Sequence, residues 1–111
     1  MKVELKLSPD TIFATARLLE QVYEMSNAIG QSEKLIRSIS YDVADAFLSK
    51  QKAVRKKQSL FEDKKKYKIS LKYHEAFVLH AVMGDLVATI QDEYTKMLLN
   101  RLSDIIHQKI A

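Results

Sequence analysis

Glycine and proline are nearly absent from this chain, and this scarcity most constrains what it can fold into. Two glycines and one proline occur in 111 residues, where average usage would give about 13. Turn-rich all-β folds and glycine-loop nucleotide-binding folds need more of these residues. Cysteine is absent, which excludes disulfide scaffolds, zinc–thiolate sites and cysteine nucleophiles. We therefore expect a mainly α-helical protein, and its 47% apolar composition is enough for one hydrophobic core.

The length fits one domain, so we expect residues 1–111 to form a single helical domain with a basic segment, residues 50–72, near its middle. Lys2, Glu4 and Lys6 interrupt the apolar residues at the N-terminus, which argues against a secretory signal. No apolar stretch approaches the ~20 residues that a membrane-spanning helix needs. These features predict a soluble, cytoplasmic protein.

Two short segments alternate between apolar and polar residues, which is typical of β-strands. Near residues 2–7 the apolar face is Val3, Leu5 and Leu7, and near residues 67–73 a similar alternation recurs. Each segment is followed by two helical patterns. The chain is therefore expected to consist of two β-α-α units, with the two strands paired.

Four helices are expected, packed as a bundle. The first starts at Pro9, because Ser8 is a good N-cap and proline suits the first helical position. It should run to about residue 28, the second from about 33 past 53, the third over 75–90 and the fourth over 92–109. The second could project beyond the core as a basic arm. The third is apolar nearly all round, which predicts a central core helix, with Gly84 allowing close packing or a kink.

The positive charge is concentrated in the basic segment. Residues 50–72 hold ten basic and two acidic side chains, a net +8, whereas residues 1–49 and 73–111 each carry −2. Attraction to a polyanion is one interpretation; a solvated helix end and connector is the other. The residues that would bind a polyanion are Lys52, Arg55, Lys56, Lys57, Lys64, Lys65, Lys66 and Lys68.

Lysine predominates over arginine in this segment, so any nucleic-acid binding should be to phosphate and independent of base sequence. Phe61 and Tyr67 interleave with the lysines and could stack on bases. Their spacing fits anchoring in the core equally well, and we favour that interpretation.

No catalytic or metal-binding motif is present. His74-Glu75 starts like the zinc-protease pattern HExxH, but Val78 stands where the second histidine must be. No Glu-x-x-His pair exists for a di-metal bundle site. We therefore expect a protein that is not an enzyme, has no cofactor and has no small-molecule substrate. His80 lies in the most apolar helix and is expected to be a core or interface histidine.

The apolar helix faces exceed what a 111-residue monomer readily covers, and such a surplus is typical of an interface between subunits. The sequence thus favours a non-catalytic, self-associating interaction module, a homo-oligomer with a dimer favoured. The alternative is non-specific nucleic-acid binding through residues 50–72. Membrane-surface binding ranks last, because residues 50–61 offer only Val54, Leu60 and Phe61 as bulky apolar side chains.

Overall fold

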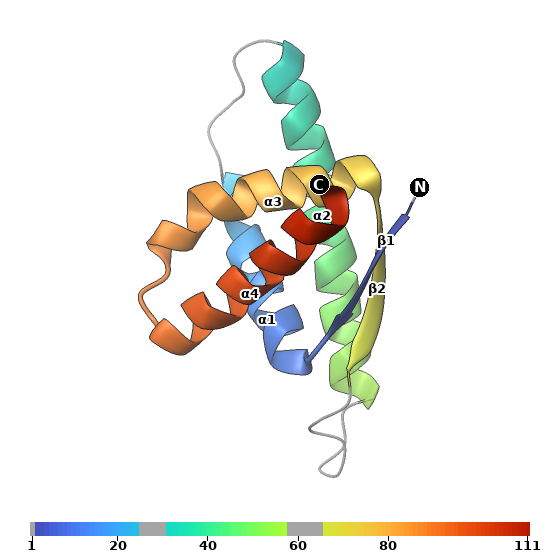
Figure 1. The fold of residues 1–111 in the computed structure, drawn as a ribbon, viewed down its shortest axis with the longest axis vertical. Coiled ribbons are helices and arrows are strands. Elements are labelled where there is room, and N and C mark those ends of the chain that lie inside the picture. Colours follow the sequence, from blue (N-terminus) through green and yellow to red (C-terminus); the bar gives the residue numbers. More distant parts are fainter. Residues whose placement is uncertain (1, 25–30, 58–65) are drawn as a thin grey trace.

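The fold is mainly helical with one small sheet. The computed structural model describes residues 2–24, 31–57 and 66–111 (Figure 1). In chain order its elements are strand β1 (Lys2–Leu7), helix α1 (Pro9–Leu19), 3₁₀ helix η1 (Glu20–Glu24), helix α2 (Gln31–Lys57), strand β2 (Tyr67–Lys72), helix α3 (Tyr73–Leu86), 3₁₀ helix η2 (Val87–Thr89) and helix α4 (Glu93–Ile110). The expected architecture, four packed helices with two short strands, is confirmed.

The two strands pair antiparallel, and each opens a β-α-α unit. The register places Val3 opposite Leu71 and Leu5 opposite Ile69. Every second residue of each strand is buried, so one face of the sheet lies on the helices and the other faces solvent. A lone two-stranded ribbon is marginal in water; here the helices cover its apolar face.

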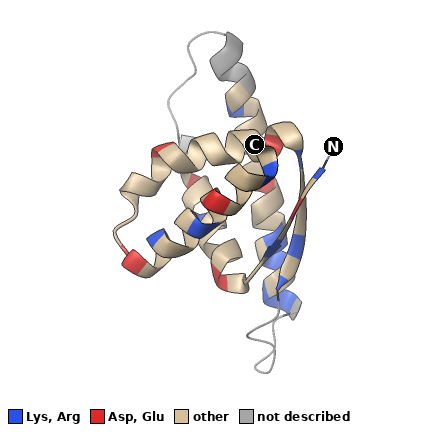
Figure 2. Ribbon diagram, viewed as in Figure 1, with Lys and Arg blue, Asp and Glu red and all other residues tan. Residues whose placement is uncertain are grey.

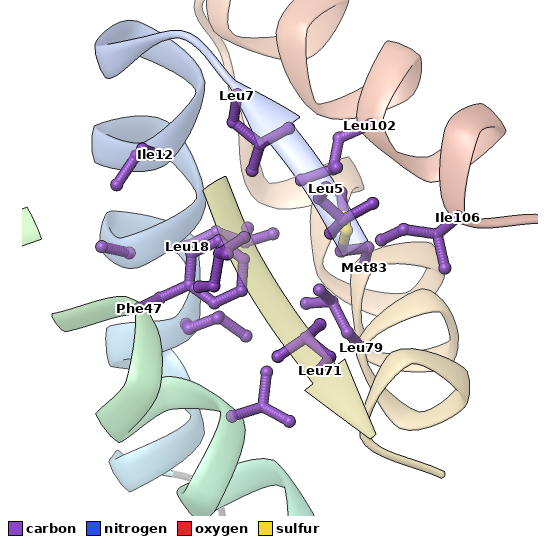
Figure 3. Packing of buried hydrophobic residues seen from close by; sticks show 14 of the residues in the cluster. Leu5, Leu7, Ile12, Leu18, Phe47, Leu71, Leu79, Met83, Leu102 and Ile106 are labelled. Carbon is purple, nitrogen blue, oxygen red and sulfur yellow. The ribbon is translucent and has the colours of Figure 1, made fainter. Parts of the chain in front are cut away.

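A single core joins the sheet to all four helices (Figure 3). In the helical layer α1 and α3 each contact both α2 and α4. The largest fully buried side chains come from every element of this arrangement, and they include Leu5 of β1, Ile12 and Leu18 of α1, Phe47 of α2, Leu71 of β2, Leu79 and Met83 of α3, and Leu102 and Ile106 of α4.

Helix starts follow the local sequence. Ser8 has extended backbone angles, and its hydroxyl accepts a hydrogen bond from the Thr11 amide, as predicted for an N-cap. The predicted change from the third to the fourth helix near residue 91 is present. The N-cap of α4 is Asp92, whose carboxylate accepts a hydrogen bond from the Thr95 amide at 2.8 Å.

Two helix ends differ from expectation. The first α-helix stops at Leu19 and continues as the 3₁₀ helix η1, rather than running as an α-helix to about residue 28; residues 25–30 lie outside the described residues. α2 stays packed on the core through Val54, one turn before its end, instead of projecting as an arm. Val54 is fully buried, and the Arg55 guanidinium lies 5.3 Å from the centre of the Phe13 ring. A cation over an aromatic face holds this end of α2 against α1.

α3 is not buried all round, which corrects the expectation of a central core helix. One side carries its buried residues, and the other exposes Phe77, Ala81 and Gly84. Gly84 does not serve close packing within the chain, because a Cβ added there would meet nothing within 4 Å in the part of the chain that the structure describes. The apolar surplus seen in the sequence is therefore partly left on the surface.

Candidate polyanion-binding face

The solvent-facing side of the sheet is dominated by lysine. The alternation that buries the apolar residues turns Lys2, Glu4 and Lys6 of β1 outward, and Lys68, Ser70 and Lys72 of β2 turn outward beside them. All six are exposed. Four positive side chains thus share one small surface with one acid and one hydroxyl.

The strand register places like charges directly opposite each other. Lys2 lies opposite Lys72, and Lys6 lies opposite Lys68. Such cross-strand pairs are destabilising. Glu4 offsets part of this repulsion, because its carboxylate forms an ion pair with the Lys68 ammonium at 3.0 Å. This pair is exposed and contributes little to stability, so the face keeps its positive charge.

The end of α2 extends the same positive region. α2 contacts β2, and Figure 2 shows Lys and Arg gathered where the end of α2 approaches the two strands. Lys52, Arg55 and Lys56 are exposed there, as is Lys66 just before β2. We define the basic face as Lys2, Lys6, Lys52, Arg55, Lys56, Lys66, Lys68 and Lys72.

Five of the eight residues predicted to bind a polyanion lie on this face: Lys52, Arg55, Lys56, Lys66 and Lys68. Two of the five have partners within the chain, since Arg55 lies over Phe13 and Lys68 pairs with Glu4. The Lys57 side chain, Lys64 and Lys65 lie outside the described residues, as does Phe61. Tyr67, for which a core position was favoured over stacking, is buried.

Sequence reasoning missed Lys2 and Lys6, which lie far from residues 50–72 in the chain. Pairing of the strands brings them to Lys72 and Lys68. The signal was present in the alternation of residues 2–7: once the apolar residues face the core, the lysines must face outward. What the sequence did not supply was the register, which decides whether Lys6 meets Lys68 or Ser70.

The chemistry of the face suits phosphate rather than bases. Its sheet portion carries lysine, which binds phosphate as a point charge and reads no base pattern. Ser70 adds a hydroxyl donor between the two lysine pairs. None of the six outward-facing residues is aromatic, so this surface offers no platform on which bases could stack.

An open cleft of about 520 Å³ lies between α1, η2 and α4, next to the Arg55 end of the basic face. Its apolar wall includes Phe13 and Leu98. Its two carboxylates already have partners: Asp10 accepts from the Tyr94 hydroxyl at 2.8 Å, and Asp92 caps α4. These hydrogen bonds raise the pKa of Tyr94 and lower the pKa of Asp92. Both acids hold structural hydrogen bonds, so this cleft supplies no unpartnered acid–base pair.

The histidines do not form a metal site. His80 is half-buried, and its ring stacks on that of His107 with centroids 5.4 Å apart. Within residues 2–24, 31–57 and 66–111 there is no group of three His, Asp or Glu side chains placed to hold a metal ion. In the same ranges no helix is both long enough and apolar enough to cross a membrane.

Comparison with protein-family models, curated proteins and solved structures gave no match to this chain. The fold and site therefore define a class only in structural terms: a small four-helix protein whose two-stranded sheet presents a lysine-rich face.

Proposed function

We propose that this protein binds the phosphate backbone of nucleic acid through the basic face, without base specificity. The observation that carries the proposal is the strand register, which sets Lys2 opposite Lys72 and Lys6 opposite Lys68. A face that serves only to stay hydrated needs polar side chains but not charges of one sign. Here mutual repulsion is maintained on the folded surface, and a bound polyanion would relieve it.

The dimensions of the face support a backbone ligand. The two lysine pairs lie four positions apart along the strands, which is about 13 Å at the usual rise of a β-strand. One nucleic-acid strand of a duplex rises about 3.4 Å per phosphate, so a few consecutive phosphates cover this length. The lysines at the end of α2 would contact the next phosphates along the ligand.

Fluorescence anisotropy with labelled single- and double-stranded DNA and RNA tests the proposal. Micromolar binding is expected at low salt, with an affinity that falls steeply as salt rises. The informative variant is Lys2→Ala/Lys6→Ala, because only the folded sheet brings these lysines to the face. For duplex DNA we expect binding weaker by about tenfold near 50 mM salt, and a salt slope smaller by about 1.8.

The matched control is Lys96→Ala/Arg101→Ala, which removes two positive charges from α4, away from the basic face (Figure 2). An equal loss in this control would show that overall charge, and not the face, drives binding. Absence of binding at low salt would leave the lysines as solvated surface.

A converse pair of variants sharpens the test. Glu4→Gln removes the acid from the centre of the lysines and should strengthen binding. Glu93→Gln changes the net charge equally on α4, at an exposed position, and should change binding less. If the two variants bind alike, the sheet is not the binding surface. Lys64→Ala/Lys65→Ala/Lys66→Ala tests the connector, and it should weaken binding to all sequences alike.

A further inference from the structure

α3 carries an exposed apolar stripe on the side opposite its core residues. Tyr73, Phe77, Ala81 and Gly84 fall within about 80° around the helix axis at 100° per residue. All four are exposed, and the Phe77 side chain is 57% exposed. Tyr73 is held in place, because its hydroxyl donates a hydrogen bond to the Ile110 carbonyl at 2.9 Å. The stripe therefore presents an ordered apolar surface.

No contact among the described residues explains why the C-terminal half of the stripe consists of small residues. Glycine inside a helix is less favourable than alanine by about 1 kcal/mol. Gly84 nevertheless occupies the last turns of α3 with open space where its Cβ would be, among the described residues. Neither backbone conformation nor neighbouring side chains require glycine here. Close approach of a second helix from outside would require it.

We propose that this stripe binds the same stripe of a second copy of the chain, with the two α3 helices antiparallel about a twofold axis. The stripe is bulky at its N-terminal end and small at its C-terminal end. In an antiparallel pair, Phe77 lies over Ala81 of the partner subunit and Tyr73 lies near Gly84 of the partner subunit. A parallel pair would instead set bulky against bulky and leave a gap at the small end.

The polar residues beside the stripe support the same occupant and the same direction. His74 and Asp85 flank the stripe on one side, about 20° apart around the axis at 100° per residue, and both are exposed. A twofold axis perpendicular to the helices brings this flank against itself. His74 of each copy then meets Asp85 of the partner subunit, where an imidazole N–H can donate a hydrogen bond to the carboxylate at two symmetric places. A parallel pair would set this flank against the opposite flank of the partner subunit, so His74 and Asp85 of the two copies would not meet.

Within the part of the chain that the structure describes, the other exposed apolar residues do not form a comparable stripe. Along the exposed side of α4, Arg101 separates Met97 from Ile105. Ile36 is 48% exposed on α2 and provides a matched control for Phe77, since both are large apolar residues on exposed helix positions.

Sedimentation velocity of the full chain, from about 1 µM to several hundred µM and without nucleic acid, tests the proposal. A concentration-dependent dimer is expected. Phe77→Glu should weaken it by at least about a hundredfold, because a charge would enter the apolar centre of the contact. Ile36→Glu should leave the dimer unchanged. A monomer at every concentration, or a dimer that Phe77→Glu does not affect, would overturn the proposal.

A charge reversal tests the direction of the pair. His74→Glu sets two acids against each other at both ends of the contact and should weaken the dimer by about tenfold. Adding Asp85→Lys to this variant sets a lysine against the new acid at both ends and should recover most of the loss. Failure of the double variant to recover dimerisation would refute the antiparallel register. These residues lie outside the basic face, so loss of the dimer and loss of nucleic-acid binding are read separately.

Discussion

α1 and α3 occupy equivalent places in the two β-α-α units, yet they expose different kinds of side chain to solvent. Each follows a strand, ends in a 3₁₀ turn and packs against both α2 and α4. α1 exposes charged residues, Asp10 and Arg17, whereas α3 exposes the apolar Phe77 and Ala81. The equivalent topology therefore determines which side of each helix is buried, whereas the residue types on the exposed side differ between the two helices.

The largest difference between the two helices should appear on truncation of one apolar side chain in each. Ile12 of α1 is fully buried, so Ile12→Ala should lower the free energy of unfolding by about 2–5 kcal/mol. Phe77→Ala on α3 should change it by no more than about 0.5 kcal/mol, since its side chain already faces solvent. Urea denaturation at low protein concentration measures both. A large loss for Phe77→Ala would mean that α3 is packed more like α1.

A smaller contrast lies at the helix starts. Ser8 caps α1 with its own hydroxyl, which accepts from the Thr11 amide. Lys72 precedes α3, and there Glu75 reaches back to accept from the Lys72 amide at 2.8 Å. Ser8→Ala should destabilise the protein by about 1 kcal/mol, as measured by denaturant unfolding. Ser8→Asp keeps an acceptor at the cap, so it should retain most of the stability; an equal loss in both variants would contradict the cap.

A substitution at Gly84 of α3 should stabilise the protein, in contrast to the two destabilising substitutions above. Gly84→Ala adds a methyl group into open space on a helix, so the monomer should gain up to about 1 kcal/mol and unfold at a higher temperature. Thermal unfolding at low concentration measures this gain. No interior position of α1 offers the same gain, because α1 contains no glycine. A loss of stability would show that the space beside Gly84 is occupied.

The smallest expected effect concerns the 3₁₀ turn η1 after α1, and it changes the free energy of unfolding only at high pH. In η1, partial burial, a hydrogen bond to the Asp45 carboxylate and the negative charges of Asp45 and Glu20 raise the pKa of Tyr23 to about 12. The unfolded chain has an ordinary tyrosine pKa near 10. Between these values the unfolded state binds fewer protons than the folded state, so stability falls as pH rises from about 10 to 12.

Tyr23→Phe should remove that part of the pH dependence while keeping the ring, which stacks on Tyr41 with centroids 5.6 Å apart. Denaturant unfolding at pH 8, 10 and 11 follows the effect. An unchanged slope in the variant would mean that other tyrosines or lysines account for the alkaline loss. Tyr94→Phe, which removes the hydroxyl bonded to Asp10, is the matched comparison.

Much of the fold was predictable because local signals were strong. Ser8-Pro9 marked the start of α1, and alternation marked both strands with the correct inward faces. The end of α1 was not predictable, because no glycine or proline stands near Leu19 and the change to η1 depends on tertiary contacts with α2. α3 was misjudged for a related reason: composition shows that a helix is apolar, but neighbours decide which side is covered.

The candidate site was predictable only in part. Clustering along the chain identified Lys52, Lys56 and Lys68, since charge density in sequence needs no fold to be seen. Lys2 and Lys6 belong to the same surface through strand pairing alone. The local sequence does not show which strand will pair with β1, so only the tertiary structure places Lys2 and Lys6 on the basic face. The proposed functions rest on these surfaces and stay predictions until binding and association are measured.

The pairing of β1 with β2 also ties the basic face to the folding reaction. Lys6 lies opposite Lys68, 62 positions further along the chain, so the face does not exist until that long loop has closed. During synthesis β1 is made first and stays unpaired until α1, α2 and then β2 have been made. A polyanion that requires the assembled face would then act as a folding ligand, favouring the native state by mass action and raising the melting temperature further as its concentration rises above the dissociation constant.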